Sequence, residues 1–485
     1  MIHTMCLCLL ILLPLSIASA MPEQVENAEK NSEEIVSSLA DQTSVAVTIY
    51  NQDLALVRDA RKISLKPGQQ TLAFREVSAK IRPQTALLAA PGLRVLEQNF
   101  EYDLLTPQSL LEKYVGQQVL LVKSHPTTGE ETKQEATVLS SGSGTVLRVG
   151  DHIESGIPGR LIFPAVPENL RDRPTLTMLV DSKNSEPQPV VLSYLTGGLS
   201  WQADYVAELG PDDTSLDLNG WVTLKNESGA TYENALLKLV AGDVNRVQER
   251  MQPRMMARGA VLAESLAMDT GMAEESMFEY HLYTLGRPTT IKEKQSKQVA
   301  LMQADGVQVK KEFVLNGQNY YYSNKAGDLG KKMKVGVFVE LKNSKEAGIG
   351  QPLPAGIMRV YKKDSSGSLQ FVGEDRIDHT PENETIRLKL GDAFDVTADK
   401  KQTDFKKLSG FSRYNYVFES AFEMVLKNAK DEAVTVQVQE PLPGDWEMVE
   451  ESAPHVKESA SAAVWRIKVE AKSSTVLTWR VKVKY

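Results

Sequence analysis

Short runs in which apolar and polar residues alternate constrain the fold of this 485-residue chain more than any other feature. From Ser44 to Tyr50, valine or isoleucine occupies every second position, and a second run covers Leu54 to Arg58. A period of two places successive side chains on opposite faces of a β-strand. Because turn residues separate such runs along the chain, we expect a mainly β protein with two or three antiparallel β-sandwich-like domains and short helices.

The N-terminus has the pattern of a secretory signal. An apolar run from Leu7 to Ile17 is followed by Ala18-Ser19-Ala20, which fits a small-x-small cleavage site, although Met1–Met5 lacks Lys and Arg. The run is shorter than a membrane-spanning helix. We therefore expect a signal peptide at residues 1–20, export to a periplasm-like space, and no transmembrane anchor after cleavage. Both cysteines, Cys6 and Cys8, fall inside this segment, so the mature chain would have no disulfide and no cysteine-ligated metal.

Changes in composition divide the rest of the chain. Residues 21–43 are polar and predict a linker with a short helix near residues 33–39, while residues 244–278 carry six methionines without a strong period. The expected organisation is a linker at 21–43, an N-terminal β-rich domain at 44–190, a central β-sandwich region at 191–400 that contains a Met-rich loop or helix excursion at 244–278, and a C-terminal β-sandwich unit at 401–485.

Local signals add detail to the N-terminal domain. Lys66-Pro67-Gly68-Gln69 lies between two apolar runs and predicts a hairpin turn, since Pro presets the backbone and Gly tolerates positive φ. Thr106-Pro107 predicts the start of a helix that ends near Gly116. Four short apolar runs then predict small antiparallel sheets, at Val119–Val122, Ala136–Leu139, Thr145–Val149 and Leu161–Phe163.

A Leu-Lys-Asn motif ends three alternating runs, at residues 224–226, 341–343 and 426–428. The last two copies are followed by Pro-Leu-Pro at 352–354 and 441–443. Asn is suited to the end of a strand because it tolerates the left-handed region and can hydrogen-bond its own turn. The repeated order of strand, Leu-Lys-Asn and Pro-Leu-Pro predicts repeated sandwich units.

The residues typical of catalytic or metal sites do not form a recognisable motif. The five histidines after the signal are scattered singly, and no HxH or HExxH spacing occurs. Ser140–Gly144 lacks the nucleophile-elbow pattern and is typical of a hairpin loop. The net charge of −8 and the pI of 5.5 argue against nucleic acid as a partner. The histidines are His125, His152, His281, His379 and His455.

Acidic residues and methionines each allow a specific and an ordinary interpretation. Asp212, Asp213 and Asp217 would serve glycoside hydrolysis only if two carboxylates faced each other across a cleft, whereas Gly210-Pro211-Asp212-Asp213 is an ordinary turn sequence. Met251/Met255 and Met268/Met272 have helical spacing that would suit Cu(I). We favour a partner-contacting segment over copper, because methionine adapts to irregular surfaces and nearby arginines would repel a cation.

Aromatic residues raise the question of sugar binding, because flat rings pack on pyranose C–H faces. Trp201, Tyr205, Trp221 and Tyr320–Tyr322 are the candidates. Tryptophans on sandwich strands usually belong to the core, which is our expectation for Trp201 and Trp221. Three adjacent tyrosines cannot share one face of a strand, so we expect some of Tyr320–Tyr322 to be exposed or covered by a partner.

Several segments resemble the mucoidy inhibitor A family of exported bacterial proteins, whose C-terminal region is a conserved domain of unknown function. The resemblance covers about residues 190–485. It is carried by Trp201-Gln202-Ala203-Asp204-Tyr205, by Asn226–Asn234, and by Asn428–Pro443 with Trp465. Typical members carry a coiled-coil arm, and no heptad pattern occurs between Ser44 and Tyr194. The resemblance implies export and a β-rich fold; the family name implies an influence on exopolysaccharide, and no catalytic residue carries over.

These observations predict a non-enzymatic, exported envelope scaffold or interaction protein that binds an envelope protein or a polysaccharide. A polysaccharide-binding module is the alternative, and an unrecognised hydrolase is a weaker one. No catalytic, cofactor or metal residue and no cofactor is expected, and the sequence leaves the binding residues open.

Overall fold

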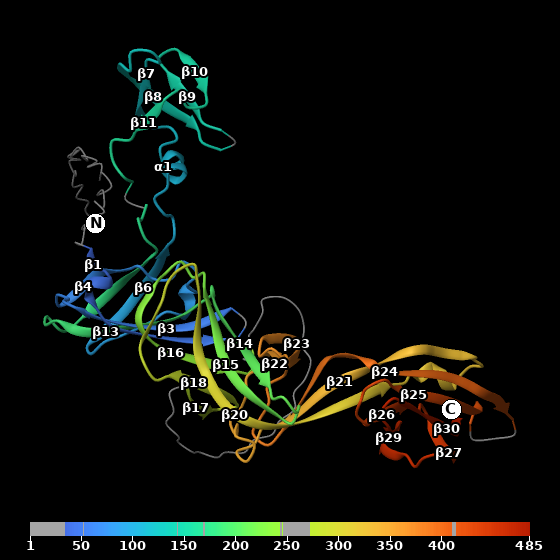
Figure 1. Ribbon diagram of the computed structural model, residues 1–485. Helices are drawn as coiled ribbons and strands as arrows, with labels where there is room; N and C mark the ends of the chain where they lie inside the picture. The colour runs from blue at the N-terminus through green and yellow to red at the C-terminus, as the bar shows by residue number, and fades with distance from the viewer. Residues whose placement is uncertain are drawn as a thin grey trace, which may run out of the picture.

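The protein is described by a computed structural model, which covers residues 34–485 except 52, 143, 168–169, 243–244, 246–271 and 410–413. It is mainly β, as the alternation predicts, and its sheets form sandwich-like layers that follow one another along the molecule (Figure 1). The expected signal peptide at residues 1–20 and most of the Met-rich segment lie outside the described residues.

Two sheets form an N-terminal sandwich. The four-stranded sheet has the order β1-β4-β12-β6, and the larger sheet has the order β17-β18-β16-β2-β3-β13-β5, with β19 paired to β16. The first contains β1 (Ile35–Ser37), β4 (Gly68–Arg75), β12 (Thr175–Ser182) and β6 (Leu93–Glu101). The second contains β2 (Gln42–Tyr50), β3 (Leu54–Ile63), β5 (Leu87–Ala89), β13 (Gln188–Thr196), β16 (Tyr232–Ala241), β17 (Met272–Met277), β18 (Tyr280–Leu285) and β19 (Thr289–Ile291).

Three local expectations for this region are wrong. The turn at Lys66–Gln69 is not a hairpin, because β3 and β4 belong to different sheets and the turn carries the chain between them. The linker does not extend to residue 43: β1 and the 3-10 helix η1 (Leu39–Asp41) replace the expected helix, and β2 begins at Gln42. The Met-rich excursion ends earlier than residue 278, because Met272–Met277 pairs with β18 as strand β17. In the first two cases strand pairing with distant residues overrides the local pattern, whereas β17 forms a hairpin with the next strand in the chain.

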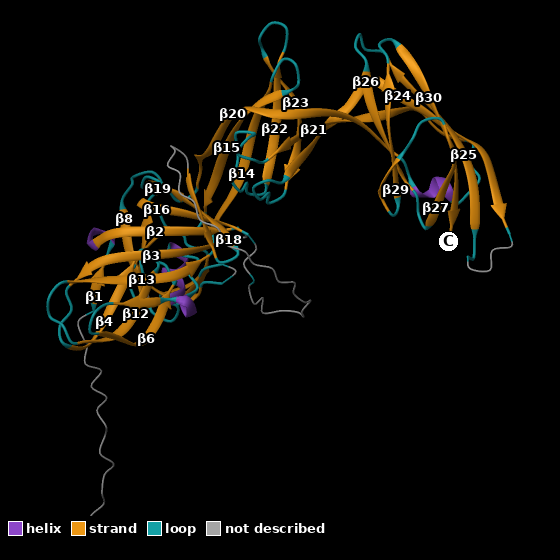
Figure 2. Cartoon of the chain, turned by 90° about the horizontal axis from the view of Figure 1, so that it is seen from below, coloured by secondary structure: helices purple, strands orange, loops and turns teal. Residues whose placement is uncertain are grey.

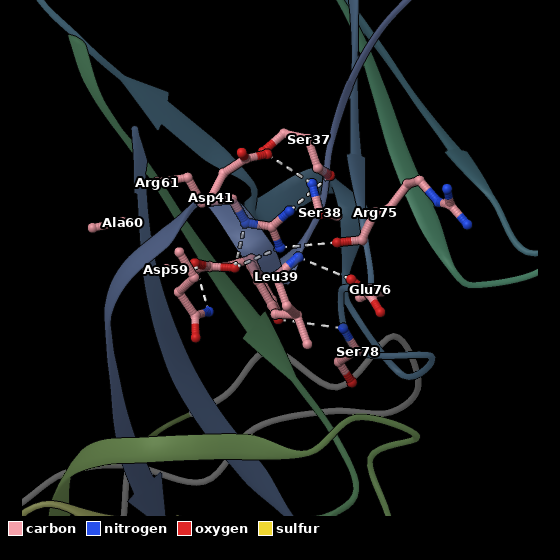
Figure 3. A network of polar contacts seen from close by, with 12 residues as sticks. Ser37, Ser38, Leu39, Asp41, Asp59, Ala60, Arg61, Arg75, Glu76 and Ser78 are labelled. Atoms are coloured by element: carbon pink, nitrogen blue, oxygen red, sulfur yellow. Dashed lines mark hydrogen bonds and ion pairs between the residues drawn. The ribbon is translucent and has the colours of Figure 1, made fainter. Parts of the chain in front are cut away.

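A buried arginine joins the two layers of the N-terminal sandwich. Arg61 on β3 donates to the Ser37 carbonyl at 2.8 Å, to the Arg75 carbonyl at 2.8 Å and to the Asp59 carboxylate at 2.8 Å (Figure 3). Its guanidinium also lies 3.8 Å from the centre of the Phe74 ring. Ser37 and Arg75 belong to β1 and β4, so the guanidinium bonds the sheet opposite its own. These hydrogen bonds hold the two layers of the sandwich together.

A small domain is inserted between β6 and β12, which pair with each other in the four-stranded sheet. The predicted helix is confirmed as α1 (Pro107–Lys113), with Thr106 as its N-cap. Five antiparallel strands follow in the order β10-β9-β8-β7-β11, around a separate core that includes Leu121 and Val138 (Figure 1). They are β7 (Gln118–Ser124), β8 (Glu131–Ser140), β9 (Val146–Val149), β10 (His152–Ser155) and β11 (Arg160–Ile162), which confirms the four predicted runs.

A row of strands continues from the central region to the C-terminus in the order β23-β22-β14-β15-β20-β21-β24-β25-β30-β27 (Figure 2). The opposing layer of the C-terminal unit contains β26, which pairs with β20 and β29, and β28, which pairs with β29. The bounds are β14 (Leu199–Leu209), β15 (Ser215–Asn226), β20 (Gln295–Asn316), β21 (Asp328–Lys342), β22 (Gly356–Lys363), β23 (Leu369–Ile377), β24 (Thr385–Leu408), β25 (Val417–Asn428), β26 (Val434–Pro441), β27 (Asp445–Glu451), β28 (Val456–Ser459), β29 (Ala462–Val469) and β30 (Ser473–Lys484); short 3-10 helices are η2 (Pro83–Thr85) and η3 (Asn319–Tyr322).

The cores do not follow the expected boundaries at residues 190 and 400. Position 190 lies inside β13, which pairs with β3, and one hydrophobic core runs from Val45 to Leu388 through the N-terminal and central regions. Position 400 lies inside β24, and a second core runs from Phe313 to Val483. The 22-residue strand β20 pairs with β15 through its first part and with β21 and β26 through its last part. Long shared strands therefore replace linkers.

Candidate functional site

The three Leu-Lys-Asn motifs have a shared structural role. Asn226, Asn343 and Asn428 are buried, and each side-chain amide donates to backbone carbonyls on both sides of a long connection. Asn428, for example, reaches the Glu432 carbonyl at 2.8 Å and the Glu470 carbonyl at 3.1 Å. None of the three adopts positive φ. The motif therefore joins the start and end of each repeated connection, a role that turn propensity alone did not predict.

The structure leaves the predicted histidines apart. His281 contacts Glu274 at 2.7 Å, and His455 contacts Glu451 at 2.9 Å. His125 and His379 each accept a backbone N–H through Nδ1, and His152 is exposed on β10. Within the described residues, no group of three or more His, Cys, Asp or Glu side chains is placed to hold a metal.

Asp212 and Asp213 lie in the turn between β14 and β15, as expected for a turn sequence, and Asp217 lies on β15. Asp212 accepts the Thr214 N–H at 3.2 Å, Asp217 accepts the Gly306 N–H at 2.8 Å, and Asp213 pairs with Lys311 at 2.7 Å and also with Lys362.

Of the methionines, Met272 and Met277 lie on β17, and the remaining ones between 244 and 271 fall outside the described residues. A polar hollow of about 390 Å³ occurs in the C-terminal unit, lined by residues that include Glu423, Glu450, Glu451 and Arg480.

The aromatic candidates separate into core and surface. Trp201 and Tyr205 are buried, which confirms the expectation for Trp201. The expectation that Trp221 belongs to the core is wrong: this residue is 39% exposed on the outer face of β15. Tyr320–Tyr322 lie on η3 and not on a strand. Tyr320 is 62% exposed while its two neighbours are buried, so the expectation that some of the three would be exposed is confirmed.

A row of hydrogen-bonded polar side chains crosses five neighbouring strands beside Trp221. We call it the Asp204 ladder, and its members are Gln298 (β20), Thr223 (β15), Asp204 (β14), Arg359 (β22) and Glu374 (β23). Gln298 donates to the Thr223 hydroxyl at 3.1 Å, and that hydroxyl donates to Asp204 at 2.7 Å. Arg359 donates to Asp204 at 3.0 Å, and its Nε lies 3.1 Å from Glu374.

Strand alternation explains why the ladder forms on the outer face. In Trp201-Gln202-Ala203-Asp204-Tyr205, the odd positions pack into the core and the even positions point outward. Trp221 lies directly opposite Asp204 in the antiparallel register of β14 and β15. Arg359 lies two residues from Tyr361 on β22, so both side chains share the face of the ladder.

The electrostatics of the ladder keep its central groups ionised. Burial raises the pKa of Asp204, but hydrogen bonds from Thr223, Arg359 and Gln202 outweigh it, and the pKa lies below its usual value. The hydrogen bond to Asp204 raises the pKa of Arg359. Asp204 therefore remains a carboxylate with its acceptor positions occupied, an arrangement that suits recognition better than proton transfer.

Aromatic rings lie next to the Asp204 ladder on the same outer face. Trp221 is two residues from Thr223 on β15, and Tyr361 on β22 forms an edge-to-face pair with Phe371 on β23 at a centroid distance of 5.6 Å. Phe371 is 55% exposed. The face thus combines fixed hydrogen-bonding groups with aromatic surface, and both are features of binding sites.

Sequence reasoning identified Trp221 as a candidate but missed Arg359 and Glu374. The available signal was the pair of polar residues, Gln202 and Asp204, at alternate positions of a strand whose other residues are apolar. Arg359 comes from a strand 155 residues further along the chain, paired in parallel with β14. The sequence pattern does not show which strands become neighbours across such a separation.

Among the described residues, no helix combines the length and apolar character needed to cross a membrane. No curated protein matches the chain. A family model described as "Domain of unknown function (DUF4139)" matches residues 190–485, which begin within β13 and include every strand of the Asp204 ladder. The chain therefore belongs to the DUF4139 family.

Proposed function

We propose that the protein is an exported, non-enzymatic scaffold or interaction protein of the bacterial cell envelope. The observation that carries the proposal is the Asp204 ladder with the aromatic rings next to it. Its side chains are held in place by one another before any partner arrives, so binding there would cost little side-chain entropy. The resemblance to the mucoidy inhibitor A family and the signal-like segment at 1–20 support the cellular location and a connection with exopolysaccharide.

The partner-binding role is testable by site-specific crosslinking in cells. A photo-reactive amino acid replaces Trp221 on the ladder face, and in a matched control it replaces Tyr416, which is 52% exposed in the C-terminal unit. We expect a discrete crosslinked protein from position 221 and none from position 416. Absence of a product at 221 in folded, envelope-localised protein would count against the scaffold role.

A polysaccharide-binding module is the second candidate, and the exposed Trp221 beside the ladder favours it. Rings of this kind pack on sugar C–H faces while neighbouring amides and charges bond hydroxyl groups. We expect Trp221→Ala to weaken binding to purified envelope polysaccharide about tenfold, equivalent to about 1.4 kcal/mol, while Tyr416→Ala leaves it unchanged. Equal binding by wild type and Trp221→Ala would exclude this face as the glycan site.

Export is tested separately from binding. If the segment at 1–20 is a signal peptide, protein recovered from the periplasmic fraction begins at Met21, which N-terminal sequencing determines directly. An intact Met1 on protein recovered from that fraction would contradict cleavage.

A further inference from the structure

A lysine and a glutamate are fully buried between the two layers of the C-terminal unit. Lys400 lies on β24 and Glu440 on β26, and both side chains are 0% exposed. The Lys400 Nζ and the Glu440 Oε1 are 2.6 Å apart. Val396 and Ala398 precede Lys400 on the same inward face, and Val436 and Val438 precede Glu440 in the same way. The pair therefore connects opposite layers inside a hydrophobic core.

Aromatic rings surround the lysine. Its Nζ lies 4.1 Å from the ring centre of Tyr321, 4.9 Å from that of Trp479 and 5.1 Å from that of Phe422. On the other side of the carboxyl group, the Tyr322 hydroxyl donates to the Glu440 Oε2 at 2.6 Å. A Cβ atom at Gly317 would lie 2.3 Å from the same oxygen, so the backbone packs closely against the carboxyl group.

This environment favours the uncharged form of the lysine. Burial lowers the pKa of Lys400, although the neighbouring carboxylate acts in the opposite direction. Transfer of one proton from the ammonium to Oε1, along their hydrogen bond, produces an amine and a carboxylic acid in contact. Well-oriented intramolecular reactions reach effective molarities of roughly 10⁵–10⁸ M, so condensation inside the core can proceed where it would not in open solution.

We propose that Lys400 and Glu440 condense in the folded protein to form an intramolecular amide bond between the two layers. The Nζ lone pair attacks the Glu440 Cδ, and negative charge develops on Oε2, where the Tyr322 hydroxyl stabilises it as a hydrogen-bond donor. A proton passes from Nζ to the Oε1 hydroxyl, the Cδ–Oε1 bond breaks and water leaves. Oε2 becomes the amide oxygen and still accepts from Tyr322. One amine and one carboxylic acid give one amide and one water, without an oxidant.

The roles of the neighbouring residues are consistent with this reaction. Burial raises the pKa of Tyr322 well above its ordinary value, so the hydroxyl remains a donor. The aromatic rings keep bulk water from the amide and thereby oppose its hydrolysis. The bond would give the C-terminal unit a covalent link between its layers in a chain whose cysteines, Cys6 and Cys8, both lie near the N-terminus. This inference does not depend on the proposed function.

Mass spectrometry of the purified protein tests the bond. We expect an intact mass one water lower than the mass calculated for the chain from its measured N-terminus, and a proteolytic product in which the Lys400 and Glu440 peptides are joined. Lys401 and Glu423 serve as an internal control, because their Nζ–Oε1 distance is also 2.6 Å but their side chains are 49% and 32% exposed. We expect no link between them. Unmodified Lys400 and Glu440 peptides from folded protein would overturn the proposal and leave an ion pair.

Two variants test the assignment of roles. Lys400→Met cannot form the amide and should show the full mass calculated for the variant chain from its measured N-terminus. Tyr322→Phe keeps both reacting groups but lacks the hydroxyl that stabilises Oε2. Its intact mass should therefore also show no loss of water. A joined product in Tyr322→Phe would overturn the role assigned to Tyr322, and the wild-type measurement stands whether or not either variant folds.

Discussion

The amide of Asn343 provides a quantitative test of the repeat. Its two N–H groups serve three backbone carbonyls, those of Gln351 at 2.8 Å, Pro381 at 2.9 Å and Thr380 at 3.2 Å. Asn343→Ala leaves the Gln351 and Pro381 carbonyls without the amide donor, while the Thr380 carbonyl keeps only the Leu353 N–H at 2.9 Å. Each lost N–H bond costs about 1 to 2 kcal/mol when its partner stays buried, so we expect a loss of about 2 to 4 kcal/mol in the free energy of unfolding.

Hydrogen exchange measures this loss where it occurs. The Leu353 and Thr380 amides bond each other's carbonyls at 2.9 Å, next to the Asn343 side chain. Because about 1.4 kcal/mol corresponds to tenfold in an equilibrium constant, these amides should exchange roughly 30-fold to 700-fold faster in Asn343→Ala. Asn343→Asp should be worse than Ala, since it turns a carboxylate toward three carbonyl oxygens.

The exposed Asn316 provides the matched control. Asn316→Ala should change stability by less than about 0.5 kcal/mol, as is usual for surface positions. If Asn343→Ala behaves like Asn316→Ala, the asparagine does not hold the connection together and the structural account of the repeat is wrong. Asn226→Ala and Asn428→Ala should likewise destabilise the connections that these two asparagines join.

Three further predictions follow from other parts of the fold. Arg61→Met leaves Asp59 buried without its cation and should destabilise the N-terminal sandwich by about 3 to 5 kcal/mol in denaturant unfolding; a loss below about 1 kcal/mol would contradict the layer-joining role. Burial raises the pKa of Tyr232 to about 12, so the folded state keeps a proton that the unfolded state releases above pH 10. Stability should therefore fall as the pH rises from 10 to 12, by up to about 2.7 kcal/mol from this group, and Tyr232→Phe should lack that part of the pH dependence. Replacing residues 104–171 by a short Gly/Ser loop should leave a folded protein with β6 still paired to β12, as measured by circular dichroism and exchange; an unfolded product would show that the inserted domain is needed for the sandwich.

Much of the local structure was predictable because it depends on neighbouring residues. The period of two located β2, part of β3 and the strands that lead into Leu-Lys-Asn, and the Thr106-Pro107 signal located α1 because capping is determined within a few residues. The Lys66–Gln69 turn shows the limit of such reasoning. Pro and Gly specify that the chain turns, but whether the next strand pairs with the previous one or crosses to another sheet depends on distant partners.

The candidate site shows the same limit. Trp221 and Asp204 were visible as residues, but Trp221 was expected in the core because strand tryptophans usually pack there. Burial on a strand depends on which face meets the second sheet, and the register of β14, β15 and β22 determines that face.

The amino-acid sequence by itself determined the β class, the repeat, the inserted helix and the exclusion of cysteine chemistry from the chain after Cys8, since each follows from composition or from patterns a few residues long. Only the tertiary structure decided the shared cores, the Asp204 ladder and the contact of Lys400 with Glu440. These features join strands that are far apart in the chain, and their pairing results from packing many side chains at once.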